Sequence, residues 1–215
     1  MLHVQSFTFN TLREHTYVIY DDTRAAAIID PGCYTQLERE ALSTFIAQKG
    51  LQVTHLINTH AHIDHILGNQ YVKVKYRVKL ALHPAEVPIL QAASQYAPAY
   101  GFPAYIPAKA EVLLNTGATI QLGNAQLKVL HVPGHSPGHI ALYCQQDKCC
   151  FSGDVLFQGS VGRTDLPGGD LTTLLHSIQH QLYTLDDAVV IYPGHGPTTT
   201  IGAEKRYNPF CKSEV

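Results

Sequence analysis

The sequence is short of clustered positive charge, of long apolar runs and of any secretion signal. Its 15 lysine and arginine residues are scattered along 215 residues and the net charge is -2, so we predict no nucleic-acid partner. No apolar stretch approaches the ~18 residues that a membrane helix needs, which predicts no membrane partner. The first residues, MLHVQSFTFN, lack a basic region followed by an apolar run, so we expect no signal peptide and a cytoplasmic protein.

The five cysteines also lack the CxxC spacing of redox and zinc motifs, and their number is odd. This pattern favours free thiols in a reducing compartment. Cys149 and Cys150 are adjacent, and neighbouring side chains of a strand point to opposite faces. We therefore expect one core thiol and one surface thiol, with no functional role for either.

Strand and helix patterns alternate without a linker, which predicts a single domain over residues 1–215. The first half has β-rich runs and then a helix over 34–49; the second half has further strands and then a helix with Asp170 as its N-cap. The apolar stripes of these helices are Leu37, Ala41, Leu42, Phe45 and Ile46, and Leu171, Leu174, Leu175, Ile178 and Leu182. The doubled order favours an α/β layered fold, with two sheets packed together and helices outside.

Residues 84–108 differ in amino-acid composition from their surroundings, because prolines and tyrosines are concentrated there. We expect an ordered excursion with one short helix. Two interpretations fit the segment equally: a wall or lid over a pocket, and a packed surface loop.

Histidine is the residue in excess, with 13 copies, and its densest cluster is NTHAHIDHILGN at residues 58–69. Within six positions this segment carries His60, His62, Asp64 and His65. It follows the strand pattern VTHLINTH, so the cluster begins where a strand ends. Sites in layered α/β folds commonly lie at such strand ends.

Three other predicted strands end in a similar way. HVPGHSPGH places His135, CCFSGDVLF places Asp154 and IYPGHGPT places His195, each close to a glycine that lets the chain turn sharply. Imidazole nitrogen and carboxylate oxygen without thiolate suit zinc, iron or manganese. Five histidines and two aspartates are too many for one tetrahedral ion, so we predict two divalent ions, zinc by preference, about 3.5–4 Å apart and sharing a carboxylate.

The remaining histidines have simpler interpretations. His176 and His180 have helical i, i+4 spacing, but no third ligand accompanies them. We expect surface or hydrogen-bonded positions for His3, His15, His83, His176 and His180, and contacts with the ligands or packing beside them for His55, His131 and His139.

A metal pair of this kind implies hydrolysis by an activated water. The cations lower the pKa of a bound water to about 7, and the resulting hydroxide attacks a carbonyl carbon whose oxygen a metal polarises. Asp64 is the candidate catalytic residue, because by position it both binds metal and accepts the proton of the water. The sequence has no GxSxG motif that would indicate a serine nucleophile.

The segment THAHIDH resembles the HxHxDH signature of the metallo-β-lactamase fold superfamily, and three later strand ends match its remaining ligand positions in order. The resemblance runs from about residue 2 to residue 210 and implies an αββα four-layer sandwich with the site at one edge. The ligand assignment that it implies is His60, His62 and His135 for the first metal, Asp64, His65 and His195 for the second, and Asp154 bridging them.

The segments GSVGRTDLPGGD and YPGHGPTTTIGAEKRYNPF further resemble the short bacterial form of the hydroxyacylglutathione hydrolases, or glyoxalase II enzymes. That resemblance implies hydrolysis of S-D-lactoylglutathione to D-lactate and glutathione. Arg163 matches a lysine of the longer enzymes, and Asp165 stands where they have a tyrosine. Arg163 either binds a glutathione carboxylate or forms an internal ion pair with Asp165 or Asp170.

Other activities remain as alternatives. A persulfide dioxygenase of the same fold would use one iron held by His60, His135 and Asp154. A lactonase or other small-ester hydrolase would use the same attack chemistry. A nuclease is disfavoured by the scattered charge, and a metal-stabilised binding module by the complete ligand set. True β-lactamases of this fold usually depart from Asp-His at positions 64 and 65, or carry cysteine at 154.

Overall fold

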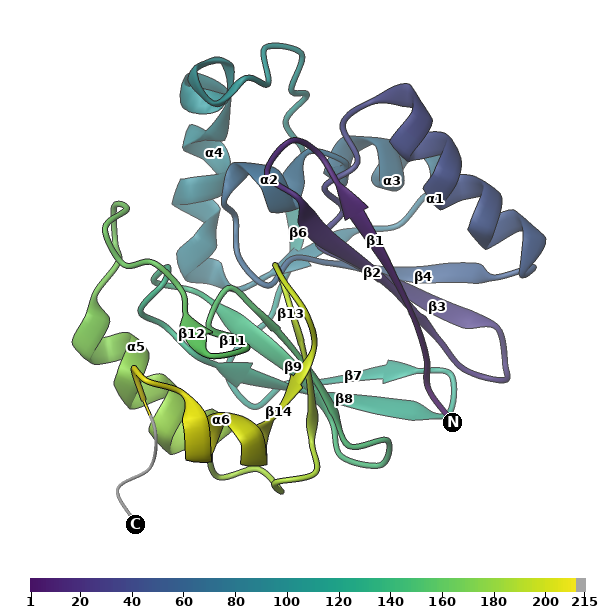
Figure 1. Ribbon diagram of the computed structural model, residues 1–215. Coiled ribbons are helices and arrows are strands. Elements are labelled where there is room, and N and C mark those ends of the chain that lie inside the picture. Colours follow the sequence, from purple (N-terminus) through teal and green to yellow (C-terminus); the bar gives the residue numbers. More distant parts are fainter. Residues whose placement is uncertain (212–215) are drawn as a thin grey trace. The chain divides into compact units, whose positions relative to one another are not determined.

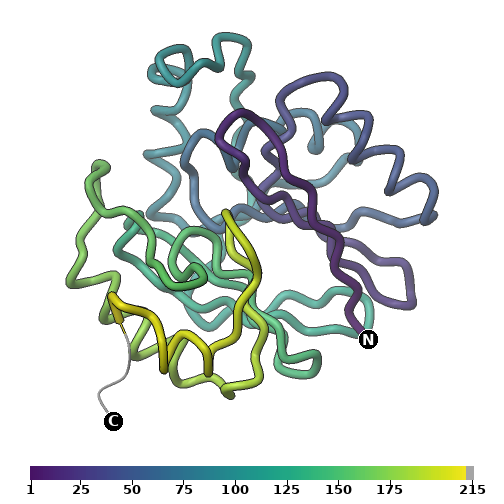
Figure 2. The backbone as a smooth tube through the Cα atoms, viewed as in Figure 1, coloured from purple at the N-terminus to yellow at the C-terminus, as the bar shows by residue number. Residues whose placement is uncertain are grey.

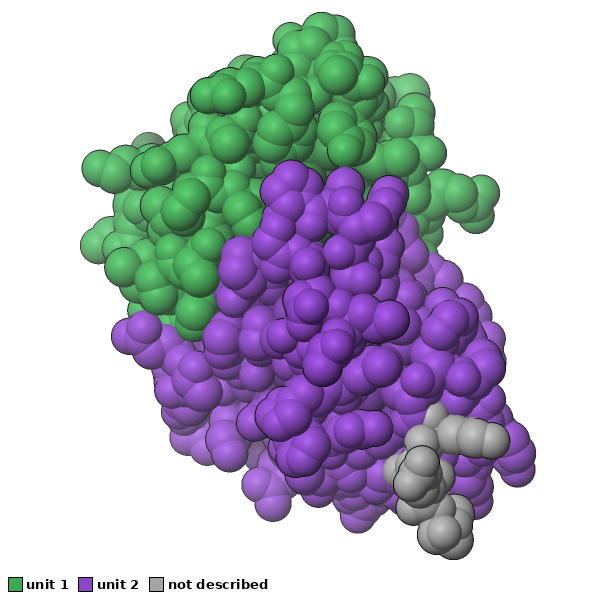
Figure 3. Space-filling model, turned by 90° about the vertical axis from the view of Figure 1, so that its left-hand side faces the viewer, with its two compact units in different colours: residues 1–114, 121–125 green, residues 115–120, 126–215 purple. Residues whose placement is uncertain are grey.

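The computed structural model describes residues 1–211, so positions 212–215 of the predicted domain lie outside the described residues. The chain divides into two compact units, residues 1–114 with 121–125, and residues 115–120 with 126 onward (Figure 3). The single domain over 1–215 stays a prediction. In the part that the structure describes, no helix combines the length and the apolar character needed to cross a bilayer.

The first unit contains a six-stranded sheet in which the strands lie side by side in chain order (Figure 1). The strands are β1 (His3–Phe9), β2 (Glu14–Tyr20), β3 (Ala25–Ile29), β4 (Gln52–Ile57), β5 (Leu80–Leu82) and β6 (Ala110–Leu113). β1 to β3 form an antiparallel meander, and β3 to β6 run parallel. Because Ile29 pairs with Ile57, the loops that follow β3 and β4 begin at the same edge of the sheet.

In chain order, the helices of this unit come between its consecutive parallel strands, as the colours of Figure 2 allow the reader to follow. They are α1 (Gln36–Gln48), α2 (Ile63–Ile66), α3 (Asn69–Tyr76), the 3₁₀ turns η1 (Pro84–Glu86) and η2 (Ala97–Tyr100), and α4 (Val87–Tyr96). Thr35 and Glu38 form a capping box at the start of α1. Leu42 and Ile46 are buried as predicted and Phe45 packs against the core. Leu37, which is 79% exposed, and Ala41, which is also exposed, were wrongly expected on the buried stripe, because only its second half reaches the core.

The proline-rich segment 84–108 is ordered, as expected, and contains α4 as its short helix. Leu90, Ala93 and Phe102 belong to the same buried cluster as Leu56 and Leu82 of the sheet. The segment is therefore packed on the core of its own unit. A role as the wall or lid of a pocket stays a prediction.

The second sheet has the strand order β14-β13-β10-β9-β8-β7. Its strands are β7 (Thr119–Leu122), β8 (Ala125–His131), β9 (Ile140–Cys144), β10 (Cys149–Gly153), β13 (Val190–Pro193) and β14 (Thr199–Thr200), and β11 (Leu156–Phe157) pairs with β12 (Ser160–Val161) in a small sheet of its own. β10 and β13 are parallel, while the pairs β8–β9, β9–β10 and β13–β14 are antiparallel.

The predicted second helix is divided into α5 (Leu171–Ser177) and a π-helical turn, η3 (Ile178–Leu182), and is followed later in the chain by α6 (Ile201–Tyr207). Asp170 caps α5 as predicted, accepting a hydrogen bond of 2.7 Å from the Thr173 backbone N–H. Leu174, Ile178 and Leu182 belong to the same buried cluster as Cys150 and Ile191 of the sheet. Leu171, in the first turn of α5, is 49% exposed.

All five cysteines are free thiols, as expected, within the described residues. The expectation of one surface thiol is wrong: Cys149 is 5% exposed and Cys150 is fully buried. The physical reason is that every residue of β10 is buried, so both faces of this strand are covered.

Candidate metal centre

The histidine cluster of the first unit lies on the loop after β4 and in the short helix α2. His60 and His65 are fully buried, and their ring centroids are 4.2 Å apart. The ring of His62 stands at 88° to that of His60, with centroids 4.8 Å apart. The Asp64 carboxylate is 3.6 Å from Nε2 of His65. The structure thus brings the four predicted ligands of this segment together.

Asp30, at the end of β3, holds this loop from the neighbouring strand. Its carboxylate accepts hydrogen bonds from the Thr59 backbone N–H at 2.7 Å and from the Thr59 hydroxyl at 2.6 Å. The same carboxylate lies 3.2 Å from Nδ1 of His65. A histidine whose Nδ1 is held by a carboxylate presents Nε2 as its ligand atom. Asp30 therefore fixes the orientation of one predicted metal ligand.

Glu86, which comes later in the chain, restrains the same loop. This residue is fully buried in η1, and its Oε2 accepts a 2.8 Å hydrogen bond from the Ala61 backbone N–H. Ala61 lies between His60 and His62, so the contact restrains the backbone that carries both rings. Because a buried carboxylate is costly without partners, its placement here indicates a specific positioning role.

Two buried asparagines complete the support of the first unit. Asn58 donates a 3.0 Å hydrogen bond to the His65 carbonyl, and Asn69 donates a 2.7 Å hydrogen bond to the Asn58 side chain.

Gly32 allows the loop after β3 to approach the backbone of Asp64 closely, since a Cβ at position 32 would lie 2.7 Å from the Asp64 carbonyl oxygen.

Glu14, on β2, is a further buried carboxyl group near this loop. Burial raises the pKa of Glu14 well above its usual value, and the neighbouring carboxylates of Asp30 and Asp64 act in the same direction. The Thr16 hydroxyl donates to it at 3.1 Å.

In the second unit, Asp154 is the centre of the predicted ligands. It follows β10, where the pairing with β13 shifts register beyond Phe151. Its Oδ2 is 3.8 Å from Nε2 of His135 and 3.5 Å from Nε2 of His195. The three predicted ligands of this unit therefore also converge. The His195 side chain is 29% exposed, so it is the most open of the three.

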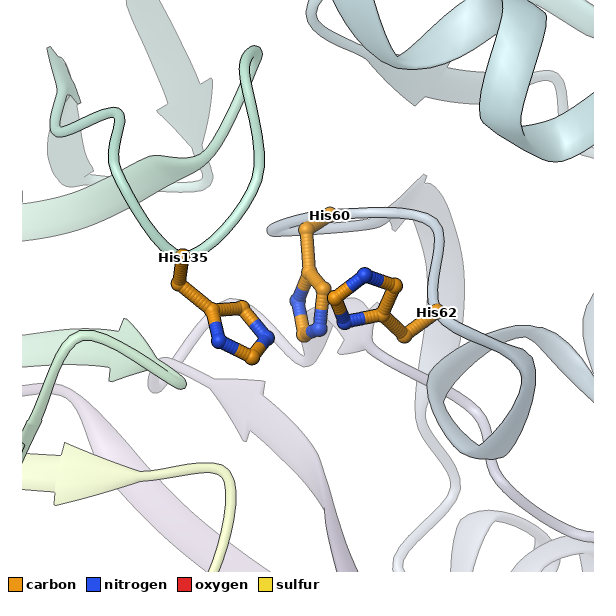
Figure 4. A group of neighbouring side chains, drawn as sticks. All are labelled: His60, His62 and His135. Atoms are coloured by element: carbon orange, nitrogen blue, oxygen red, sulfur yellow. The ribbon is translucent and has the colours of Figure 1, made fainter. Parts of the chain in front are cut away.

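His135 lies on the loop after β8, and a backbone carbonyl holds its ring. Nδ1 of His135 is 2.8 Å from the Arg163 carbonyl oxygen, which leaves Nε2 as the ligand nitrogen. Figure 4 shows this side chain, together with His60 and His62 on the loop that leads from β4 to α2. The backbone N–H of Asp154 donates to Nε2 of His139 at 3.1 Å.

The donor set fits the predicted metals. Both half-sets consist of imidazole nitrogen and carboxylate oxygen, which zinc, iron and manganese accept. Anchoring of Nδ1 by a carboxylate or a backbone carbonyl is the arrangement typical of metal-binding histidines. Within the first unit, Asp30, His60 and His65 also offer atoms within 4.8 Å of one another.

The supporting residues divide into predicted and missed ones. His139 contacts a predicted ligand, as expected, whereas His131 bonds to the Pro137 carbonyl at 3.1 Å. Asp30 and Glu86 were not predicted as site residues. The Asp-Pro-Gly turn directly after the AAAII strand was a usable signal for Asp30, because it places a carboxylate at a strand end. Nothing in the spacing of Glu86 relates it to Ala61.

Of the two interpretations of Arg163, the ion pair with Asp165 is present. Nε and Nη2 of Arg163 each donate to the Asp165 carboxylate at 2.7 Å. The hydrogen bond from Arg163 lowers the pKa of Asp165 to about 2. The Asp170 alternative is not the one observed, because that side chain caps α5.

Comparison with known proteins decides the family. A family pattern described as the metallo-beta-lactamase superfamily matches residues 10–195, a range that includes every predicted ligand. The chain belongs to the metallo-β-lactamase superfamily. The resemblance seen in the HxHxDH motif and the predicted α/β fold of this superfamily are thereby confirmed.

Relatives in the superfamily match almost the whole chain. A Haemophilus influenzae protein named hydroxyacylglutathione hydrolase GloC is 36% identical over 217 residues, covering 99% of this chain and 100% of the relative. The structure named BLEG-1 B3 metallo-beta-lactamase has a TM-score of 0.89 at 37% identity, covering 98% of this chain and 100% of that one. The structure named TTHA1623 in a di-iron-bound form has a TM-score of 0.85 at 37% identity, covering 96% and 100%. The protein is a metallo-hydrolase of this superfamily.

Proposed function

We propose that this metallo-hydrolase is a cytoplasmic, dinuclear metal-dependent enzyme that cleaves thioesters such as S-D-lactoylglutathione. The observation that carries the proposal is the pair of half-sets, each with one histidine whose Nδ1 is anchored: His65 by the Asp30 carboxylate and His135 by the Arg163 carbonyl. Similarity along the whole chain to a protein named hydroxyacylglutathione hydrolase supports the thioester as substrate. The substrate is a small molecule, and neither a nucleic acid nor a membrane is part of the proposal.

The two half-sets would together hold two divalent ions, with zinc as the first choice and iron or manganese as alternatives. Asp154 suits the bridging role, because its Oδ2 is already within 3.8 Å of two imidazole nitrogens of its own unit. The proposed ligands are His60, His62 and His135 for one ion, Asp64, His65 and His195 for the other, and Asp154 for both.

The side chains of this site would divide the work of thioester hydrolysis. Ions held by these residues would lower the pKa of a bound water to about 7 and would polarise the substrate carbonyl. Asp64 is the proposed proton acceptor, and its carboxylate lies 3.6 Å from Nε2 of His65, within the ligand cluster. Arg163 is the proposed partner of a substrate carboxylate, which it would bind by exchanging its ion pair with the exposed Asp165.

The test of substrate class is a hydrolysis panel with elemental analysis of the same sample. The panel contains S-D-lactoylglutathione, a simple thioester, a lactone and a cephalosporin. The proposal predicts the highest kcat/KM for S-D-lactoylglutathione. Equal or better turnover of the lactone or the cephalosporin would overturn the thioester assignment.

Asp64→Asn separates the proposed base from the fold. The amide keeps the shape and an oxygen ligand but accepts no proton, so kcat should fall by about 100-fold or more, with little change in Tm. Turnover close to that of the unchanged protein would remove Asp64 from this role. Asp22→Asn is the matched control, since that carboxylate is 76% exposed and, among the described residues, forms its ion pairs with the amino terminus and His3.

Two specific observations favour other candidates. The structural likeness to a protein named a B3 metallo-beta-lactamase keeps β-lactam hydrolysis as a second candidate, in spite of the Asp-His pair at 64 and 65. The di-iron form of another similar structure favours an iron test. A persulfide dioxygenase would instead consume oxygen with glutathione persulfide and hold one iron per chain, and oxygen-electrode measurements distinguish it from a hydrolase.

A further inference from the structure

The hairpin formed by β9 and β10 ends in two cysteines that face each other. Cys144 is the last residue of β9, Cys149 is the first of β10, and the two are direct partners in the antiparallel register. Opposed residues in such a pair have Cα atoms about 4.5–5.5 Å apart, which lies inside the range of about 4.4–6.8 Å that a disulfide requires. Both side chains consequently point to the same face of the sheet.

The two thiols already interact. A hydrogen bond from the Cys149 thiol lowers the pKa of Cys144 to about 7, and the Asp147 backbone N–H contributes in the same direction. Burial and the Asp147 carboxylate, which lies 3.6 Å from Sγ of Cys144, oppose this shift. The same contact raises the pKa of Cys149. The shared contact therefore lowers the pKa of one of the two thiols, and the thiolate is the form that attacks a disulfide.

The neighbouring cysteine is excluded from this pair by the strand geometry. Cys150 is paired in register with Tyr143, so its side chain points to the opposite face of the sheet. Burial raises the pKa of Cys150 to about 12. The adjacent cysteines of β10 are therefore not equivalent, and Cys149 is the one that faces Cys144.

The position at the end of the hairpin gives the pair a route to solvent. Cys144 and Cys149 are buried, but the turn between them includes the exposed residues Gln145, Gln146 and Lys148. Lys148 has a left-handed backbone conformation with φ of 46°. Fraying of such a turn exposes its closing pair without unfolding the sheet.

We propose that Cys144 and Cys149 are a reversible redox site that closes to an intramolecular disulfide by exchange with a low-molecular-weight disulfide. The Cys144 thiolate attacks one sulfur of glutathione disulfide and releases one glutathione thiolate, which takes up a proton. The Cys149 thiol then loses its proton and attacks the mixed disulfide at Cys144, and the second glutathione leaves. The protein is oxidised by two electrons, and one glutathione disulfide becomes two glutathione molecules.

The bridge should be easy to reduce again. It closes a loop of only four intervening residues, 145–148, so the entropic stabilisation is at the low end for disulfides. A bridge between directly opposed strand residues is also geometrically constrained, and constrained disulfides have higher reduction potentials. The site does not depend on the thioesterase activity, and metal content should not change when it is oxidised.

The test uses the full-length protein in buffers of increasing glutathione disulfide to glutathione ratio, followed by acid quenching, alkylation and trypsin digestion. Lys148 lies between the two cysteines, so trypsin separates peptide 129–148 from peptide 149–163 unless a disulfide joins them. We expect the joined pair to increase with the ratio and to disappear on addition of dithiothreitol. Fragment masses should locate the bridge at Cys144 and Cys149.

Three variants serve as controls, with circular dichroism to check each fold. Cys144→Ser and Cys149→Ser should abolish the joined peptides, and Cys150→Ser should retain them. If a serine variant fails to fold, the fragment masses of the unchanged protein still decide. Absence of joined peptides at the most oxidising ratio, or a bridge that involves Cys150, would overturn the proposal.

Discussion

The two half-sets of the proposed metal centre are supported in different ways. In the first unit, the segment from the loop after β4 through α2 carries four ligands. Buried side chains from the turn after β3, from η1 and from α3 hold this segment at several atoms. In the second unit, three separate strand ends each deliver one ligand. The Arg163 carbonyl contacts the ring of His135, and the His139 ring accepts a hydrogen bond from the backbone of Asp154. The difference teaches that ligands clustered in one segment can share the side chains that hold it, whereas ligands from separate strand ends are positioned by separate parts of the chain.

The largest expected effect comes from removing the shared support. Asp30→Ala leaves the Thr59 N–H and hydroxyl and Nδ1 of His65 without their acceptor. Metal affinity at the site of His65 should fall by about 10–100-fold. Unfolding free energy should fall by about 1–3 kcal/mol, because buried donors lose their partner. Chelator competition and denaturant titration measure the two effects.

Asp30→Asn is the matched variant, since it keeps an oxygen acceptor for the Thr59 N–H but no charge. We expect an intermediate loss of metal affinity. Full affinity in Asp30→Ala would mean that His65 is oriented without this carboxylate, and that the first unit has no shared support.

The next effect concerns the contact from η1. Glu86→Ala removes the acceptor of the Ala61 N–H, so the backbone between His60 and His62 becomes less restrained. We expect a loss of about 1–3 kcal/mol in unfolding free energy and a several-fold loss in metal affinity. Glu86→Gln retains an acceptor oxygen and should recover most of both. If Glu86→Gln is as impaired as Glu86→Ala, the negative charge rather than the hydrogen bond is what matters.

A smaller effect is expected in the second unit. His139→Ala removes one acceptor, that of the Asp154 backbone N–H, while His135 keeps its own contact with the Arg163 carbonyl. Binding of the ions should weaken by less than in Asp30→Ala, and the unfolding free energy should fall by about 1–3 kcal/mol. A loss of affinity larger than that of Asp30→Ala would reverse the comparison between the units.

The smallest effect on metal binding belongs to Arg163→Ala. His135 bonds to the backbone carbonyl of this residue, which the substitution retains, so the ion content should be unchanged. If the guanidinium binds a substrate carboxylate, KM for S-D-lactoylglutathione rises by about 10-fold while a simple thioester is unaffected. Equal KM values in the variant and the unchanged protein would leave Arg163 with its ion pair to Asp165 alone.

The sequence predicted the elements and the ligand candidates better than their supports. The strand-end histidines and aspartates were visible because metal ligands recur in short motifs, such as His60 to His65. Asp30 was missed because its role depends on β3 and β4 being parallel neighbours with matched ends. Glu86 was missed because its partner is a backbone N–H, which no side-chain pattern records. The exposed Leu37 shows that helical periodicity alone does not set the width of a buried face.

The central claim is that the side chains of both half-sets together hold two ions, and elemental analysis tests it most directly. Protein produced with zinc, iron and manganese available, then desalted, should contain about two ions per chain. Asp154→Asn should retain well under one, because the proposed bridge serves both positions. One ion or none in the unchanged protein, or two tightly held ions in Asp154→Asn, would contradict the account.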